Sequence, residues 1–198
     1  MMAYVYHRVP ADMTGQKLLP LNELKKSQPE LYDKYTKKYM DHPKRKHLLM
    51  RKIPKLNCYW NDVIHLLPID PTKVYGALRE AGMNEKDMLF YQIPLSLFPD
   101  HAQFAFYHYR PEAYEGPGSD MKDSEITLVN RDHFQCVEYI RKETKSYYEE
   151  SIRENRPFGL FHYIPHIFYR GSINITETEI ISWKEKTISP EYAKNKKV

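Results

Sequence analysis

Cysteine, glycine and long apolar runs are all scarce in this chain, and each scarcity excludes a class of protein. The 198 residues contain two cysteines, Cys58 and Cys136, and seven glycines. Two distant cysteines cannot form the disulfide framework of a small secreted domain, and no Cys/His spacing is typical of a zinc site. No apolar run approaches the roughly 20 residues that cross a bilayer, and the first residues lack a signal-peptide pattern. We therefore expect a reduced, cytoplasmic protein with no membrane span and no metal.

Several catalytic and nucleotide-binding motifs are missing as well. There is no GxGxxG pattern and no P-loop, so a nucleotide would have to be bound by other means. No serine or cysteine lies in the context of a nucleophile elbow, which argues against a hydrolytic triad. His162 and His166 are four residues apart, so on a strand both side chains would lie on the same face. The strand would place them roughly 13 Å apart, however, which is too far for one metal ion.

Tyrosine and clustered positive charge are what the sequence has in excess. It contains 17 tyrosines, a residue suited both to half-buried strands and to surfaces that stack on ligands. The net charge is only +4, yet residues 34–55 carry nine Lys/Arg against one acid, Asp41. This segment is either a solvated helix face or a surface for a polyanion. For a nucleic-acid acceptor, the predicted contact residues are Lys44, Arg45, Lys46, Arg51 and Lys52.

Apolar periodicity and capping residues predict the order of strands and helices. In the clearest helix, Asp70 has the place of an N-cap, Pro71 that of a first-turn residue and Gly82 that of a C′ residue. Asp132 and Gln135 are spaced like a capping box at the start of a second long helix. The predicted strands cover 3–9, 88–95, 103–110, 125–129, 159–170 and 173–183, and the predicted helices cover 21–26, 29–40, 70–82 and 132–155.

This order of elements predicts an α+β fold, in which helices pack on a central, mostly antiparallel or mixed sheet. The length suits one domain over residues 1–198. Within it we expect a basic helical segment at about 21–56 and a flexible loop at about 110–124, where glycine and proline recur.

In the last predicted strand, two glutamates share a face with apolar side chains. Glu177 and Glu179 are two residues apart, so a strand would place them on one face, roughly 6.5 to 7 Å apart. Such a pair can orient a sugar hydroxyl, stabilise a developing oxocarbenium ion or act as a base. The alternative is a hairpin or edge strand whose glutamates face water.

Two further polar groups are candidates for chemistry. His7 and Arg8, at the exit of the first strand, can bind ribose hydroxyls and a pyrophosphate, or they can have ordinary surface and core roles. Asp62 and His65 are three apart, so on a helix they would share a face and form an acid/base dyad. Their alternative roles are capping and core packing.

The order of these motifs resembles the ADP-ribosyltransferase superfamily, in particular the branch of the DarT-like DNA ADP-ribosyltransferases and the RNA 2′-phosphotransferases. The resemblance is carried by "YHRV" in the first strand, "MLFYQIPLSLFPDHAQFAFYHY" in the middle and "TETEIISW" in the last strand. It implies an ADP-ribosyltransferase-like fold and a toxin-like enzyme that uses NAD as substrate. The acceptor would be a nucleic acid or a protein.

The same resemblance implies a role for each matching residue. Glu179 would stabilise the oxocarbenium-like centre as nicotinamide leaves, and Glu177 would orient or activate the acceptor. His7 or Arg8 would hold the ribose or phosphates of NAD, and Tyr91 or Tyr107 would stack on the nicotinamide.

Other functions are compatible with the same residues. A non-catalytic module could bind nucleic acid or a nucleotide through the basic, tyrosine-rich region, because charge and aromatic faces together suit single-stranded ligands. A metal-independent nuclease or other hydrolase could use Asp62 and His65. A structural or interaction protein is the remaining alternative.

Overall fold

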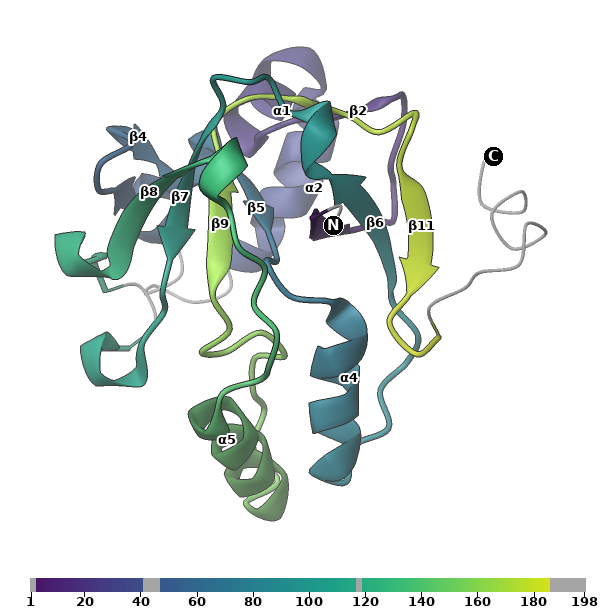
Figure 1. Cartoon of the computed structure of the whole chain (residues 1–198), viewed down its shortest axis with the longest axis vertical. Helices are drawn as coiled ribbons and strands as arrows, with labels where there is room; N and C mark the ends of the chain where they lie inside the picture. The colour runs from purple at the N-terminus through teal and green to yellow at the C-terminus, as the bar shows by residue number, and fades with distance from the viewer. Residues whose placement is uncertain (1–2, 41–46, 117–118, 186–198) are drawn as a thin grey trace.

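The computed structural model describes residues 3–40, 47–116 and 119–185, and its centre is a pair of antiparallel sheets (Figure 1). The first sheet has the order β1-β6-β11, formed by Tyr4–Arg8, Leu89–Pro94 and Glu179–Ser182. The second has the order β5-β9-β7-β8, formed by Ile64–Leu66, His166–Tyr169, Gln103–Tyr107 and Ile126–Asn130. Two short pairs accompany them: β2 (Lys17–Leu18) with β10 (Ile173–Asn174), and β3 (Lys52–Ile53) with β4 (Cys58–Tyr59).

A backbone bridge joins the two sheets. Tyr6 in β1 and Leu67, directly after β5, each donate a backbone hydrogen bond to the other's carbonyl oxygen, at 3.0 and 2.8 Å. The edges of the two sheets therefore meet, and Figure 1 shows them standing next to each other. Strands β6 and β7 are neighbours in sequence but belong to different sheets, so the chain crosses from one sheet to the other between them.

Helices pack around these sheets as the α+β prediction requires. The described α-helices are α1 (Leu21–Ser27), α2 (Pro29–Met40), α4 (Pro71–Glu80) and α5 (Lys142–Arg153). In Figure 1, α4 and α5 extend below the sheets, while α1 and α2 lie together behind their upper part. The predicted α+β class with antiparallel pairing is confirmed. Among the described helices, none has the length and apolar character needed to cross a membrane.

Alternation along β1 sends successive side chains into different cores. Val5 is buried with Leu66 and Ile93 on one face of the first sheet, whereas Tyr6 is buried with Val74 and others on the opposite face. The second of these cores also holds Tyr148 of α5 and therefore fixes both lower helices to the sheet. A third core packs on the second sheet and comprises Ile53, Cys58, Val63, Ala105, Tyr107, Met121, Ile126 and Phe168.

Helix α4 forms where the local signals predict it. The Asp70 carboxylate accepts hydrogen bonds from the backbone nitrogen and the hydroxyl of Thr72, at 2.9 and 2.7 Å, and Pro71 occupies the first turn. Gly82 ends the helix with a φ of +94°, a left-handed conformation that glycine adopts without strain. These contacts satisfy backbone groups that a helix end otherwise leaves open.

Replacing Asp70 with alanine is expected to lower the free energy of unfolding by about 1 kcal/mol, because the Thr72 N–H loses its acceptor. Urea denaturation followed by far-UV circular dichroism measures this loss. Asp33→Ala is the matched control, since Asp33 is exposed in α2 and its carboxylate caps no described helix. Equal losses in the two variants would contradict a capping role for Asp70.

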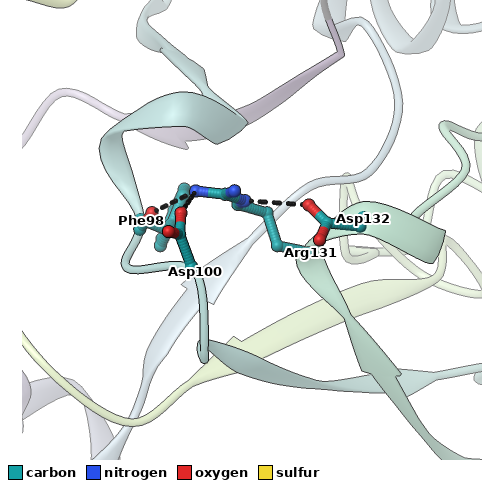
Figure 2. A network of polar contacts seen from close by, with 4 residues as sticks. All are labelled: Phe98, Asp100, Arg131 and Asp132. Atoms are coloured by element: carbon teal, nitrogen blue, oxygen red, sulfur yellow. Dashed lines mark hydrogen bonds and ion pairs between the residues drawn. The ribbon is translucent and has the colours of Figure 1, made fainter.

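The helix predicted over 132–155 is wrong in its first half, because α5 begins only at Lys142. The segment between β8 and α5 has another conformation, and contacts of Arg131 hold its start. The Arg131 guanidinium donates to the Phe98 carbonyl at 2.9 Å and pairs with Asp100 and Asp132 at 2.7 and 3.2 Å (Figure 2). Farther along, the Val137 nitrogen donates to the Pro68 carbonyl at 2.8 Å. The apolar residues that suggested a helix are divided between two cores, with Phe134 in the first and Val137 and Ile140 in the second.

Candidate functional site

The pairing of the first sheet separates the residues predicted to bind and cleave NAD. His7 lies opposite Tyr91, which in turn lies opposite Ile180, so these side chains share one face. Glu179 lies opposite Gln92 and therefore points to the other face. His7 and Glu179 are thus on opposite sides of the same sheet.

Glu177 does not lie in a strand at all. The Asn174 side-chain oxygen accepts a hydrogen bond from the Thr176 nitrogen at 3.0 Å, which bends the chain directly after β10. The next strand, β11, begins at Glu179, and both glutamates are exposed. The predicted continuous strand over 173–183 is therefore wrong, and the two carboxylates form no cleft-facing pair. They match the alternative of glutamates that face water.

The other predicted NAD contacts are also dispersed. His7 is enclosed, its Nδ1 has no hydrogen-bond partner among the described residues, and burial lowers its pKa to about 4. Arg8 is exposed at the end of β1, while Tyr107 lies in the second sheet and in a different core. Transfer of ADP-ribose stays a prediction from the sequence, and the strand register gives it no support.

Asp62 and His65 have structural contacts instead of sharing a helix face. Asp62 ends a short 3-10 turn and accepts hydrogen bonds from the Tyr59 backbone nitrogen at 2.8 Å and the Asn22 side chain at 2.6 Å. His65 lies in β5, where its Nε2 is 3.0 Å from the Trp60 carbonyl and its ring packs 4.1 Å from the Trp60 ring. Capping and packing therefore account for both side chains.

The predicted nucleic-acid contacts are only partly described. Lys44, Arg45 and Lys46 lie outside the described residues. Lys52 is exposed in β3, as a surface contact requires, whereas Arg51 is 9% exposed. Arg51 is therefore a buried charge and not a member of a solvated helix face.

The structure gathers a different set of side chains, which we call the tyrosine–histidine hollow. It is an open hollow of about 690 Å³ between α5, the segment that follows α5, and the loop after β7. Its lining residues are Tyr114, Lys142, Glu143, Ser146, Tyr147, Glu150, Arg156, His162 and Tyr163. Rings from three separate stretches of the chain thus face one space.

His162 is the centre of the ring contacts in this hollow. Its imidazole stacks on Tyr147 with centroids 4.1 Å apart and planes at 27°, and it contacts Tyr163 at 3.9 Å and Tyr114 at 4.9 Å. Burial, with a smaller contribution from the charge of Arg156, lowers the pKa of His162 to about 4. The imidazole is therefore neutral at pH 7 and offers an uncharged, polarisable ring.

A hydrogen bond fixes the orientation of this imidazole. The Tyr109 hydroxyl lies 2.9 Å from Nδ1 of His162, and burial raises the pKa of the Tyr109 phenol, so the phenol keeps its proton. A protonated phenol can donate to Nδ1, which leaves the ring proton on Nε2. Tyr109 in turn stacks on Tyr107 of β7, with centroids 5.1 Å apart and planes at 17°.

Two tyrosines of this cluster have left-handed backbone conformations. The φ angles are +48° at Tyr109 and +58° at Tyr163, and their rings lie 5.6 Å apart. A bulky residue in this region costs roughly 1 to 3 kcal/mol and persists only where the surroundings require it. Such strain concentrates at functional sites, so it supports the interpretation that the hollow is a functional site.

Charged groups of both signs border the rings. Lys142 and Arg156 supply positive charge. The Arg156 guanidinium pairs with Glu154 at 3.3 Å and lies 6.0 Å from the centroid of the Tyr147 ring. Glu143 and Glu150, on the same side of α5, supply negative charge. The arrangement can hold a planar, aromatic ligand by stacking and an anionic group by the cations. Within the described ranges, no three His, Cys, Asp or Glu side chains are grouped so as to hold a metal ion.

Sequence reasoning missed the hollow because it tested His162 and His166 only as metal ligands. The available signal was the density of rings in "FAFYHYRPEAY" and "GLFHYIPHIFY", which lie far apart in the chain. Comparison with protein families, with curated proteins and with solved structures finds no match for this chain.

Proposed function

We propose that this protein binds single-stranded nucleic acid, or its nucleotides, by stacking bases on the rings of the tyrosine–histidine hollow. The observation that carries the proposal is that Tyr114, Tyr147, His162 and Tyr163 line one open hollow together with Lys142 and Arg156. Base stacking on an aromatic side chain is worth about 1–3 kcal/mol per base and suits every base. Lys and Arg beside the rings neutralise the phosphates.

The rings are held in place before a ligand arrives. Tyr147 stacks on His162, and its hydroxyl accepts a hydrogen bond from the Gly159 nitrogen at 3.2 Å. Tyr148, the next residue of α5, donates its hydroxyl to the Leu160 carbonyl and anchors the same segment. Side chains that are already ordered lose little conformational entropy on binding, which favours affinity.

A single strand suits this site better than a duplex. Bases must leave their own stack before a side chain can stack on them, and single strands offer unstacked bases. Glu143 and Glu150 repel phosphates, whereas Arg156 attracts them. We therefore expect the phosphate backbone of the ligand on the side of Arg156, with its bases toward Tyr147 and His162.

Replacing Tyr147 with alanine is expected to weaken binding of a short fluorescein-labelled oligothymidine by about 5- to 100-fold, the loss of one stacking contact. Fluorescence anisotropy at low salt measures the dissociation constant. Tyr139→Ala is the matched control, because Tyr139 is 71% exposed and lies outside the hollow. It should bind like the unaltered protein.

Two results would contradict this proposal. One is equal affinity of the Tyr147 and Tyr139 variants, and the other is an affinity that does not fall as salt is added. The same proteins, incubated with NAD, report any release of nicotinamide. Nicotinamide release follows from the sequence resemblance to ADP-ribosyltransferases, whereas stacking alone does not produce it.

A further inference from the structure

The charged groups that line the tyrosine–histidine hollow differ in whether they already have a partner. Arg156 pairs with Glu154 at 3.3 Å. Glu143 and Glu150 are exposed, and neither carboxylate takes part in a hydrogen bond or an ion pair within the described part of the chain. A carboxylate accepts hydrogen bonds and donates none. The hollow therefore presents unused acceptors beside its rings, and they are complementary to a ligand that carries N–H donors.

Helix α5 sets the order of these groups along the hollow. Glu143, Tyr147 and Glu150 follow one another at spacings of four and three residues, so they lie on one face of the helix. The two glutamates are separated by roughly 10 Å along the helix axis, and the tyrosine lies between them. A base that stacks on the rings of the hollow therefore has a carboxylate toward each end of the helix.

The two ends of this row differ in their neighbours. Glu150 lies one turn before Glu154, whose carboxylate pairs with Arg156, so it belongs to the end where we expect the phosphates. Glu143 lies in the first turn of α5, directly after Lys142, which also lines the hollow. The ammonium of Lys142 has no ion-pair partner among the described residues. The end that remains for the base edge thus offers one group that accepts and one that donates.

Among the four DNA bases, guanine is the one whose edge matches this pair of groups. Its N1–H and its amino group lie side by side, and the carbonyl oxygen O6 follows them. One carboxylate can accept both N–H groups through its two oxygens, and an ammonium can donate to O6. Thymine has a single N–H between two carbonyl oxygens, and adenine and cytosine carry a ring-nitrogen acceptor beside the amino group. A carboxylate repels such acceptors.

We propose that the tyrosine–histidine hollow prefers guanine, with Glu143 accepting the N1–H and amino hydrogens of the base and Lys142 donating to O6. This preference rests on the proposed function and names the base and the residue that selects it. Stacking contributes affinity for every base, whereas the contact with Glu143 distinguishes one base from another.

The experiment uses fluorescein-labelled oligothymidines of one length whose central base is thymine, guanine or hypoxanthine. A single guanine in each strand avoids quadruplex formation. The guanine strand should bind about 5- to 100-fold more tightly than the thymine strand, the discrimination typical of a bidentate contact. Hypoxanthine keeps N1–H and O6 but lacks the amino group, so it should lose most of this gain. The ratio of affinities should not change with salt, because the strands carry the same number of phosphates.

Replacing Glu143 with glutamine is expected to bring the affinities for the guanine and thymine strands to within about threefold of each other, because one of the two acceptor oxygens becomes a donor. The side chain is exposed, so the variant should keep the fold, which far-UV circular dichroism verifies. Glu149→Gln is the matched control, since Glu149 is exposed on the same helix and lies outside the hollow. Both variants remove one negative charge, yet Glu149→Gln should keep the full preference.

The outcomes separate the guanine preference from the stacking function. If oligothymidine binds and Tyr147→Ala weakens it, but guanine gives no gain, the stacking function stands and the preference is overturned. A preference that survives in Glu143→Gln overturns the role of Glu143, and equal binding of guanine and hypoxanthine overturns the bidentate contact. If the unaltered protein binds none of the strands, both proposals fall.

Discussion

Replacing Trp183 with alanine is expected to lower the free energy of unfolding by about 3–5 kcal/mol, the loss typical of a large buried ring. Trp183 is fully buried directly after β11 and contacts the rings of Tyr75 in α4 and Phe90 in β6, at 5.4 and 6.2 Å. Its indole nitrogen donates to the Lys86 carbonyl at 3.2 Å. One side chain therefore holds the edge of the first sheet to a helix and to the turn before β6.

The measurement is urea denaturation followed by far-UV circular dichroism, since indole fluorescence would change with the substitution itself. Trp183→Phe keeps most of the buried area but removes the indole N–H, so it should lose about 1–2 kcal/mol. Tyr139→Ala, at a ring that is 71% exposed, should change the stability by less than about 0.5 kcal/mol. A loss below about 1 kcal/mol in Trp183→Ala would show that β11 unfolds separately from the rest of the molecule.

The elements that sequence reasoning predicted correctly are those with local causes. Helix α4 has its cap, its first-turn proline and its terminal glycine within thirteen residues, Asp70 to Gly82, so no distant contact is needed to define it. The segment before α5 had helical periodicity, but its apolar side chains separate into two cores that only the folded sheet creates. Periodicity cannot distinguish one helix face from two buried surfaces on either side of an extended chain.

Which residues of two strands share a face of the sheet depends on the register of their pairing. The sequence of one strand does not determine that register. His7 and Glu179 are related only through β6, by the pairs His7–Tyr91 and Glu179–Gln92. A shift of one residue in either pairing would have placed both side chains on the same face. The predicted NAD site therefore depended on two long-range pairings that no local motif encodes.

The tyrosine–histidine hollow depends on long-range contacts for the same reason. Its rings come from the loop after β7, from α5 and from the segment after α5, and no spacing within one of these stretches indicates the others. What the sequence did show was an excess of tyrosine beside basic residues, which is the composition of a stacking surface. Composition suggested stacking on aromatic rings as a hypothesis, whereas only the fold shows which rings meet.

Acidification from about pH 7 to about pH 4.5 is expected to destabilise the protein by several kcal/mol. Burial lowers the pKa of three histidines, His7, His162 and His166, from 6.5 to about 4. Between these two values the unfolded chain binds protons that the folded chain does not, so stability is fully present above pH 6.5 and falls as the pH approaches 4. Each group contributes about 3 kcal/mol at most.

The variant His166→Gln isolates one of these groups. The Nδ1 of His166 is 2.7 Å from the Ile164 carbonyl, so that nitrogen carries the proton, and a glutamine amide can also donate to a carbonyl. Urea denaturation at both pH values should show a loss in His166→Gln about two thirds that of the unaltered protein, because His7 and His162 keep their lowered pKa values. His101→Gln, at an exposed histidine, should keep the full loss. Equal pH dependence in all three proteins would contradict a buried, neutral His166 and would assign the acid sensitivity to carboxylates.

Protonation of a buried histidine should also affect ligand binding in the hollow. Protonation of His162 would place a proton on Nδ1, the atom that faces the Tyr109 hydroxyl, and would remove its capacity to accept that hydrogen bond. Because burial holds the pKa of His162 at about 4, the bond persists through the neutral range and fails only in acid. Oligothymidine binding should therefore be constant from about pH 8 to pH 6 and should decline only as the pH approaches about 4. Binding that declines near pH 6.5 would show that His162 titrates as an exposed imidazole and that the hollow is not held as the structure shows.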